Sequence, residues 1–269
     1  MNLTEVDNGS TTTKALPFVA SSSLTIGSYN IYVGDANGNI WQMAEDDGSA
    51  SSMVSTALEI GSTQSVTNNG VTSTQPIKYV GYTQLNGVPY VWATSASQIT
   101  AFKFTSTGWQ PDWNSFTGGA GSWINGTYTP SSGSGPSRNS IQWLPVTASI
   151  DANTIFVDGS LVVPVYVPAS GNSAACGVGS GYYYLYALNN GYFPNGTFTD
   201  STGNAITNNI LVGLGTPYAA QVSTLHNGGL MLYGSSQQNT SGGISVQASA
   251  VARQNVGDGV TAWRNYQMQ

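Results

Sequence analysis

Residues 31–43 constrain the fold more than any other segment of this chain. Apolar residues alternate up to Val33, a polar turn follows, and the alternation resumes after it. Gly38 can adopt the positive φ that a tight hairpin turn requires, and Asp35 can accept hydrogen bonds from the turn backbone. The pattern predicts a β-hairpin whose second strand carries a large aromatic ring, Trp41. Hairpins of this kind are common units of β-propeller blades.

Further hairpin signals recur along the chain. Asn86-Gly87 and Asp158-Gly159 each separate two apolar runs and favour tight turns. Gly, Ser and Thr interrupt every helical pattern of apolar residues, so the fold class is all-β. Hairpin groups recur roughly every forty to sixty residues, which favours a β-propeller over a sandwich, where turns come every 8–12 residues. We expect four or more recognisable blades, in a complete, partial or modified ring.

The chain divides into two parts on this interpretation. Residues 1–28 are a polar N-terminal arm or the remnant of an earlier blade, and residues 29–269 are the propeller domain. Residues 105–140 are dense in Gly, Ser and Thr and are expected to be the longest irregular stretch, with strands resuming at 141–144. The aromatic residues of that stretch either pin it to the core or form a contact surface.

Composition restricts the partners. Charged residues make up 7% of the chain, against about 25% in an ordinary soluble domain. The net charge is −6, and the six Lys and Arg residues are scattered. Because phosphate backbones are bound by clustered basic side chains, we expect no nucleic-acid partner. No apolar run is long enough to span a membrane.

Few side chains suit catalysis or metal binding. The single histidine, His226, stands beside turn residues, and the single cysteine, Cys176, is a free thiol, a partner for a cysteine of another chain, or a small core residue. Without clustered His and Cys we expect no zinc or copper site. Asp46-Asp47, Asp151 and Asp158 are interpreted as turn formers, although paired carboxylates facing one cleft stay an alternative.

The low charge also suggests where the protein works. A fold with few ion pairs loses little stability when carboxylates become protonated, so we expect an extracellular protein from an acidic habitat. A Ser-, Thr- and Asn-rich surface protein from ordinary surroundings is the alternative. Residues 1–30 lack the basic start and apolar run of a signal peptide, which favours a mature or excised fragment.

An ordered set of motifs resembles the C-terminal domain of the PilY family, the type IV pilus biogenesis factors and tip adhesins. The similarity runs from about residue 29 to the end of the chain. The set comprises Tyr32-Val33-Gly34-Asp35-x-x-Gly38-Asn39-Ile40-Trp41, Gln75-Pro76-Ile77, Asp158-Gly159-x-Leu161-Val162-Val163, Cys176-Gly177-x-Gly179-x-Gly181 before Tyr184-Leu185-Tyr186-Ala187-Leu188, and Ala262-Trp263-Arg264.

The resemblance implies a β-propeller displayed at a pilus tip or cell surface, with roles in pilus extension and retraction, adhesion or surface sensing. It implies pilin or minor pilins as partners, together with a solid surface or a host or mineral receptor. Family members often carry a calcium loop. Residues 35–39 and Asp151-x-Asn153 are the nearest matches here, but neither has a closing acid, so we expect ordinary turns and no cofactor.

Three functions remain open at this point. The first is a non-enzymatic pilus-associated adhesin that binds through aromatic- and amide-rich loops. The second is a secreted propeller enzyme, either quinoprotein-like or an acid-active hydrolase, and the third is a structural filament or surface-layer subunit. For the adhesin, the candidate contact residues are Trp109, Trp113, Phe116, Trp123, Tyr182 and Tyr184.

Overall fold

The computed structural model describes residues 2–7, 10–15, 25–27, 30–44, 58–62, 66–68, 71–73, 75–117, 121–124, 127–130, 141–170, 177–194, 196–200, 202–224, 230–238 and 245–251. Within these ranges the chain is all-β, as predicted, and contains no helix. Accordingly, these ranges include no helix with the length and hydropathy needed to cross a membrane.

The strands of the described residues are mostly short. They are β1 (Asn2–Asp7), β2 (Ser10–Ala15), β3 (Thr25–Gly27), β4 (Asn30–Gly34), β5 (Asn39–Ala44), β6 (Leu58–Ser62), β7 (Val66–Asn68), β8 (Val71–Ser73), β9 (Tyr79–Leu85), β10 (Val88–Thr94), β11 (Gln98–Thr105), β12 (Gly108–Phe116), β13 (Gly121–Ile124), β14 (Thr127–Pro130), β15 (Ile155–Val157), β16 (Ser160–Val167), β17 (Ser180–Ala187), β18 (Phe198–Thr199), β19 (Ile210–Pro217), β20 (Gln221–Thr224), β21 (Leu230–Gln238) and β22 (Ser245–Val251).

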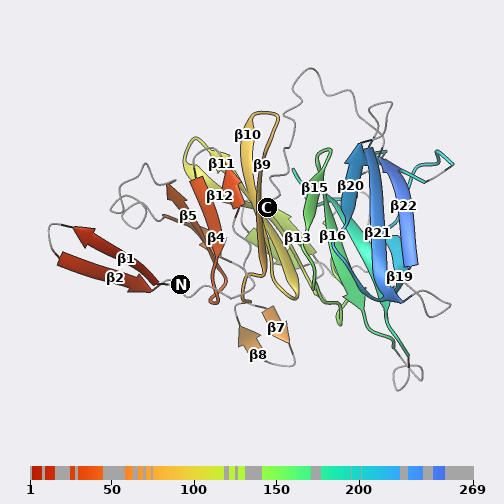
Figure 1. The fold of residues 1–269 in the computed structure, drawn as a ribbon, viewed down its shortest axis with the longest axis horizontal. Helices are drawn as coiled ribbons and strands as arrows, with labels where there is room; N and C mark the ends of the chain where they lie inside the picture. Colours follow the sequence, from red (N-terminus) through yellow and green to blue (C-terminus); the bar gives the residue numbers. More distant parts are fainter. Residues whose placement is uncertain are drawn as a thin grey trace, which may run out of the picture.

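Three larger antiparallel sheets stand one after another along the long axis of the molecule (Figure 1). The first sheet is the meander β3-β4-β5-β6, and the second is the meander β12-β11-β10-β9. The third sheet has the order β15-β16-β17-β19-β21-β22-β18, with β20 paired to β21. The hairpins β1–β2, β7–β8 and β13–β14 form separate two-stranded sheets.

The second sheet is buried on both faces because its strands alternate apolar side chains to either side. Val91 and Phe102 belong to a core shared with Tyr32 and Ile40 of the first sheet. The side chains of the opposite face belong to a core shared with the third sheet and the connector at 141–150. That core includes Trp92, Ile99, Trp113, Leu144, Ile150, Leu161, Val163 and Tyr186.

The third sheet curls around a core of its own. Val157, at the end of edge strand β15, and Phe198, on the opposite edge strand β18, belong to the same buried cluster. Tyr183 and Leu185 of β17 lie in that cluster too, whereas Tyr186 faces the second sheet. The sheet is therefore nearly closed and barrel-like.

The predicted hairpins form where the turn residues favour them. Residues 30–34 pair with residues 40–44 across the turn that contains Gly38, whose φ is 85°. Asn86 and Gly87 have φ of 52° and 77°, and Asp158 and Gly159 have φ of 45° and 77°. Two successive positive φ values suit the right-handed twist of the flanking strands, which is why Asn-Gly and Asp-Gly occupy these positions.

The expectation of an irregular stretch at 105–140 was wrong over residues 108–116, which form β12, and over residues 121–124 and 127–130, where β13 pairs with β14. Strand β12 spans residues 108–116 and pairs along its length with β11. Ala101 opposes Trp113 while Phe102 opposes Pro111, so Asp112 is the extra residue of a β-bulge. The bulge breaks the two-residue alternation that a sequence pattern needs, and Pro111 adds a further irregularity.

Two other boundaries differ from the expected ones. Residues 141–144 do not form a regular strand, and only Leu144 takes part in an isolated bridge, to Thr117. The first sheet begins at Thr25, inside the segment assigned to the arm, because β3 pairs with β4. The chain thus enters its first sheet slightly earlier than the hairpin alone indicated.

Candidate binding groove

An aromatic groove lies where the first and second sheets meet. Its volume is about 180 Å³. Strands β4 and β5 of the first sheet and strands β9, β10, β11 and β12 of the second contribute side chains, so the groove exists only when both sheets are packed together. The lining residues are Tyr32, Gln42, Tyr82, Gln84, Pro89, Phe104 and Trp109, and we call this set the aromatic groove.

The rings of the groove contact one another in a continuous series. Tyr32 and Tyr82 are stacked with their centroids 5.1 Å apart and their planes at 10°. Trp109 meets Tyr32 edge-on at 5.9 Å and Phe104 edge-on at 5.4 Å. Such offset and edge-to-face pairs stabilise the arrangement beyond the area that they bury. Phe104 remains 47% exposed, so the outer end of the series faces solvent.

Two amide side chains hold the rings in place. The Trp109 Nε1–H donates a hydrogen bond to Gln42 Oε1 at 2.5 Å, and Gln84 Nε2 donates to the Tyr82 hydroxyl at 3.2 Å. A tyrosine hydroxyl is neutral at physiological pH, and burial, with a smaller contribution from the neighbouring Tyr82, raises the pKa of Tyr32 further. The lining contains no Asp, Glu, Lys, Arg or His. The groove can therefore bind through ring faces and amide hydrogen bonds, without charge.

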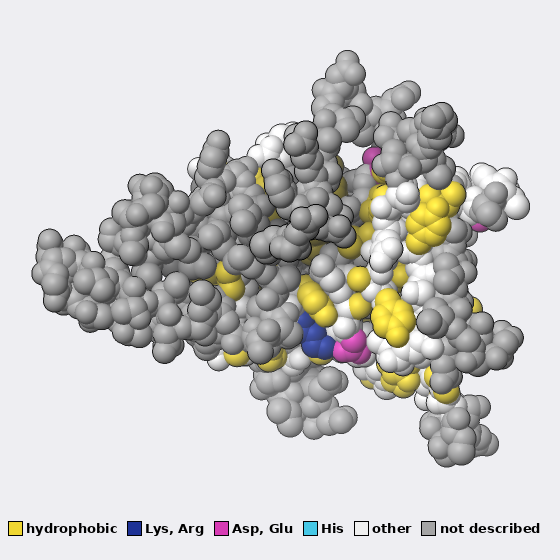
Figure 2. Space-filling view, in the orientation of Figure 1, with side chains coloured by type: hydrophobic (Ala, Val, Ile, Leu, Met, Phe, Trp, Pro, Cys, Tyr) yellow, Lys and Arg dark blue, Asp and Glu magenta, His cyan; other side chains and the backbone are white. Residues whose placement is uncertain are grey.

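Charged side chains are also scarce on the described part of the face drawn in Figure 2. In Figure 2 the described part of the face is mainly white and yellow, with few blue or magenta side chains. Among the described residues there are two ion pairs, Lys78–Asp151 at 2.7 Å and Lys103–Asp112 at 2.5 Å. Neither ion pair lines the aromatic groove.

The predicted contact residues separate into different environments. Trp109 lines the aromatic groove. Trp113, by contrast, is 1% exposed, stacks on Tyr186 at 5.4 Å and donates its indole N–H to Leu188 O at 2.7 Å, so it is a core residue. Phe116 is half-buried and meets Trp143 edge-on at 4.9 Å.

Two other predicted contact residues, Tyr182 and Tyr184, do not line the groove. Tyr182 and Tyr184 of β17 are half-buried and meet edge-on at 6.3 Å. Burial, with a further contribution from Tyr182, raises the pKa of Tyr184 to about 12. Trp123 lies on β13, and its side chain is outside the described residues. The structure thus brings Trp109 together with rings from other strands but not with Trp113, Phe116, Tyr182 or Tyr184.

Sequence reasoning missed most of the groove. Tyr32, Gln42 and Tyr82 come from hairpins that the sequence predicts, but the pairing of two sheets decides which of their faces meet. One signal was available within the sequence. Tyr32 precedes the turn at 35–39 and Gln42 follows it, so the hairpin places them directly opposite each other.

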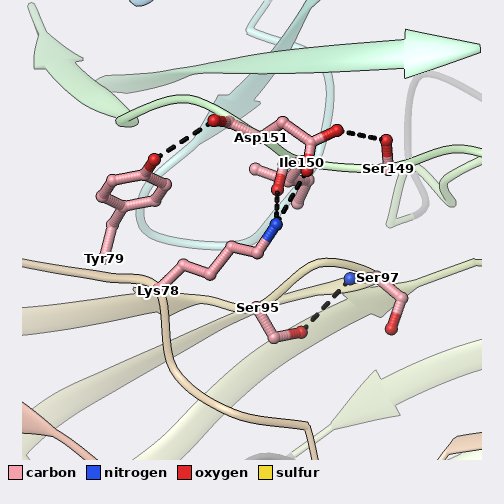
Figure 3. Close-up of polar contacts among 7 residues, drawn as sticks. All are labelled: Lys78, Tyr79, Ser95, Ser97, Ser149, Ile150 and Asp151. Carbon is pink, nitrogen blue, oxygen red and sulfur yellow. Dashed lines mark hydrogen bonds and ion pairs between the residues drawn. The ribbon is translucent and has the colours of Figure 1, made fainter. Parts of the chain in front are cut away.

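A polar junction fastens the second sheet to the connector before the third (Figure 3). Lys78 Nζ donates to Asp151 Oδ1 at 2.7 Å and to Ile150 O at 3.1 Å. Ser149 Oγ donates to Asp151 Oδ2 at 2.5 Å, and the Tyr79 hydroxyl donates to Asp151 O at 3.2 Å. Burial opposes ionisation of Asp151, but the hydrogen bonds from Lys78 and Ser149 and the Lys78 charge outweigh it, so its pKa is lowered. We interpret this carboxylate as structural.

The same connector meets the turn between β10 and β11. Ile150 N donates to Ala96 O at 2.8 Å, and within the turn Ser97 N donates to Ser95 Oγ at 3.3 Å. Both serines are buried. Each polar contact replaces water that the buried turn backbone would otherwise need, so the junction holds the second and third sheets in a fixed relation.

Both oxygens of the Asp35 carboxylate accept hydrogen bonds from residues of its own hairpin. Asp35 is 1% exposed, and its Oδ1 accepts hydrogen bonds from the backbone N–H groups of Asn37 and Asn39, each at 2.8 Å. Its Oδ2 accepts from Asn39 Nδ2 at 3.1 Å and from the Trp41 indole at 3.0 Å. This pattern is that of an Asx-type turn, in which the carboxylate satisfies backbone donors.

The turn at Asp200 repeats this arrangement. Asp200 Oδ1 accepts from the backbone N–H groups of Thr202 and Asn204, each at 2.9 Å, and Oδ2 accepts from Asn204 Nδ2 at 3.3 Å. In both turns the glycine N–H donates to the aspartate carbonyl, and the aspartate N–H donates to the asparagine carbonyl four residues on. The first and third sheets therefore share one Asp-x-x-Gly-Asn turn.

The structure describes only some of the residues that were considered for catalysis or metal binding. Within the described ranges no group of three or more His, Cys, Asp and Glu side chains is placed to hold a metal ion. His226, Cys176 and Asp46-Asp47 lie outside the described residues. Asp158 occupies the turn between β15 and β16.

Comparison with known proteins adds no relative. No protein-family model matches this chain, and a search of curated proteins finds no significant match.

Proposed function

We propose that this chain is a non-enzymatic, surface-exposed binding domain of a type IV pilus-associated adhesin or biogenesis protein, and that it binds through the aromatic groove. The observation that carries the proposal is the groove itself, which combines four aromatic rings, two amides and no charged side chain. Such a surface offers contact area and hydrogen bonds but no acid, base or nucleophile apart from tyrosine hydroxyls. The pilus assignment rests on the PilY-like order of motifs in the sequence.

We further propose that the sheets are blades of a modified β-propeller. Two observations support this arrangement. Two successive four-stranded meanders pack face to face, as adjacent blades do, and the middle sheet is buried on both sides. The first and third sheets also share the same Asp-x-x-Gly-Asn turn. The third, barrel-like sheet departs from a four-stranded blade and is the modified part of the proposed ring.

An extracellular location and a pilus context follow from the proposal. Partners on this view are pilin or minor pilins on one side and a solid surface or a host or mineral receptor on the other. The scarcity of charge supports binding that does not depend on ionic attraction. It also supports the acidic habitat, because the described residues form two ion pairs, so little ion-pair stabilisation is lost when carboxylates become protonated.

The test is attachment of beads that carry the full chain to a panel of solids, including silica, a sulfide mineral and polysaccharide-coated glass. Phe104→Ala and Trp109→Ala remove ring area from the groove. Tyr218→Ala is a matched control because Tyr218 is a 51% exposed aromatic residue outside the groove lining. We expect both groove variants to reduce bead retention at least tenfold while the control retains it.

Attachment by the groove variants at the parent level would overturn the groove as the binding site. Circular dichroism and thermal unfolding of each variant separate loss of binding from loss of fold. Capture of purified pilin subunits by the parent chain tests the pilus partner independently. If neither pilin nor a mixture of minor pilins is captured, the pilus assignment is wrong even where attachment to solids persists.

A further inference from the structure

We propose that the occupant of the aromatic groove is a neutral pyranose unit of a polysaccharide or glycan. This inference rests on the proposed function, because it names the ligand class of the same site. The C–H groups on one face of a pyranose ring are electropositive and complement the negative faces of aromatic rings. Its hydroxyl groups both donate and accept hydrogen bonds, as the side-chain amides of Gln42 and Gln84 do.

The size of the groove fits one sugar ring. Its volume of about 180 Å³ is below the ~300–1,000 Å³ of pockets that enclose a drug-sized ligand. The outermost ring, Phe104, is 47% exposed, so a ring stacked there keeps its other substituents in solvent. A polysaccharide chain can thus place one unit in the groove while the rest continues outside it.

Charge supports a neutral sugar over an acidic one. No Lys, Arg or His lines the groove, so a uronate, sialate or sulfated sugar would find no cation there. The polar side-chain groups of the lining are the amides of Gln42 and Gln84, the hydroxyls of Tyr32 and Tyr82, and the Trp109 indole N–H. The Tyr32 hydroxyl carries no charge either, because a tyrosine is protonated at neutral pH and burial raises its pKa further.

A proline-rich peptide is the other usual ligand of aromatic grooves, and it is titrated in parallel with the sugars below. In this groove the Trp109 N–H is already donated to Gln42 Oε1 at 2.5 Å. Since the oxygen of Gln42 holds Trp109, its NH2 group is the part of that amide left to donate to a hydroxyl.

The experiment follows the Trp109 indole N–H by NMR while neutral oligosaccharides are added to the full chain. The panel contains glucans, mannans, galactans and N-acetylglucosamine oligomers. Trp109→Phe assigns the Trp109 resonance. The buried Trp113, bonded to Leu188 O, is the internal reference. We expect at least one neutral oligosaccharide to shift the Trp109 signal saturably and leave the Trp113 signal in place.

Three controls sharpen the result. Phe104→Ala should weaken the saturable binding at least tenfold, and Tyr218→Ala should leave it unchanged. Binding should vary less than twofold between 50 mM and 500 mM salt, because a neutral ligand has no charge to screen. A proline-rich peptide and an acidic oligosaccharide are titrated in parallel.

The inference is overturned if no neutral oligosaccharide shifts the Trp109 signal, or if only the peptide or the acidic sugar does. Its failure is distinguishable from failure of the proposed function. Loss of bead attachment in Trp109→Ala without any sugar binding refutes the sugar and retains the adhesin groove. Sugar binding in solution with full attachment by Trp109→Ala refutes the adhesin groove and retains the sugar.

Discussion

Trp109 and Gln42 are 67 residues apart in the sequence, yet the indole N–H of one donates to the amide oxygen of the other at 2.5 Å. Trp109 lies on β12 of the second sheet and Gln42 on β5 of the first. This hydrogen bond therefore spans the junction of the two sheets and fixes the ring that closes the aromatic groove.

Replacing Gln42 with Leu should destabilise the protein by about 1 kcal/mol, because the Trp109 N–H loses its acceptor while it stays half-buried. Urea unfolding measures the change. Gln110→Leu is the control, since Gln110 is exposed on the same strand as Trp109. A double-mutant cycle with Trp109→Phe isolates the pair, and a coupling energy of zero would contradict its role.

Gly81 should not tolerate a side chain. A Cβ at this position would overlap the ring of Trp92, its partner on β10, and Trp92 is buried against Phe156. Gly81→Ala should therefore cost about 1–3 kcal/mol, in the range of overpacked cores. Thermal unfolding tests this expectation. Gly87→Asn is the control, because no atom lies within 4 Å and Asn accepts a positive φ.

Rescue of Gly81→Ala by a smaller residue at position 92 distinguishes overlap from a change in the strand itself. Gly81→Ala combined with Trp92→Leu should lose less stability than the sum of the single variants. Strict additivity of the two losses would mean that the Trp92 ring is not what excludes the methyl group.

Asp112 should contribute more to stability in mild acid than at neutral pH. Burial raises its pKa, although the hydrogen bond and charge of Lys103 lower it in part. The contribution of this group is fully present below the ordinary pKa near 4 and is lost as the pH rises through the raised folded value. Asp112→Asn should remove that loss, so the gap between urea midpoints at pH 4 and pH 7 should narrow.

Lys103→Met is the companion variant for Asp112. Without the lysine, the pKa of Asp112 should rise further, and the loss of stability towards neutral pH should increase. Opposite changes in the two variants are the expected signature. An unchanged pH dependence in both would show that Asp112 has an ordinary pKa.

Asp151 should behave in the opposite way. Its folded pKa is lowered, so the stability that it contributes is present above the ordinary value near 4 and is lost as the pH falls through the folded value. Asp151→Asn should therefore be destabilised at pH 7 and approach the parent at pH 2. Lys78→Met should reproduce this profile, and additivity of the two substitutions would contradict the ion pair.

Asp200 should keep its charge to unusually low pH. The Thr202 hydroxyl is the main cause, followed by the Asn204 backbone N–H, and together these lower the pKa to about 2. The stabilisation is present above the ordinary pKa and is lost as the pH falls through about 2. Carbon-13 NMR of the carboxyl group measures the titration. Thr202→Val should move the pKa upwards, whereas an ordinary value in the parent would refute the turn geometry.

The sequence was sufficient where structure is decided locally. Asn86-Gly87 and Asp158-Gly159 set their turns through φ values that few other residues adopt, and the alternation around residues 31–43 defined its hairpin. The fold class followed from the same signals. Strand β12 was missed because the bulge at Asp112 shifts the alternation partway along it.

The aromatic groove could not be predicted in the same way. Trp109 was predicted as a contact residue because it is an aromatic residue in a polar stretch. Trp113 is an aromatic residue in the same stretch, yet it is buried. Four positions separate the two, and the bulge between them reverses the parity that would put them on one face. Only the pairing of sheets distant in the sequence brings Tyr32, Tyr82 and Trp109 to one place.

The second sheet, which contributes to a core on each of its faces, has a consequence for synthesis. Residues 79–116 leave the ribosome after the strands that cover one side and before residues 155–187, which cover the other. Until those later residues emerge, Trp92, Ile99 and Trp113 form an uncovered apolar surface on the nascent chain. A chain arrested between the two segments keeps this apolar surface exposed and is therefore prone to aggregate.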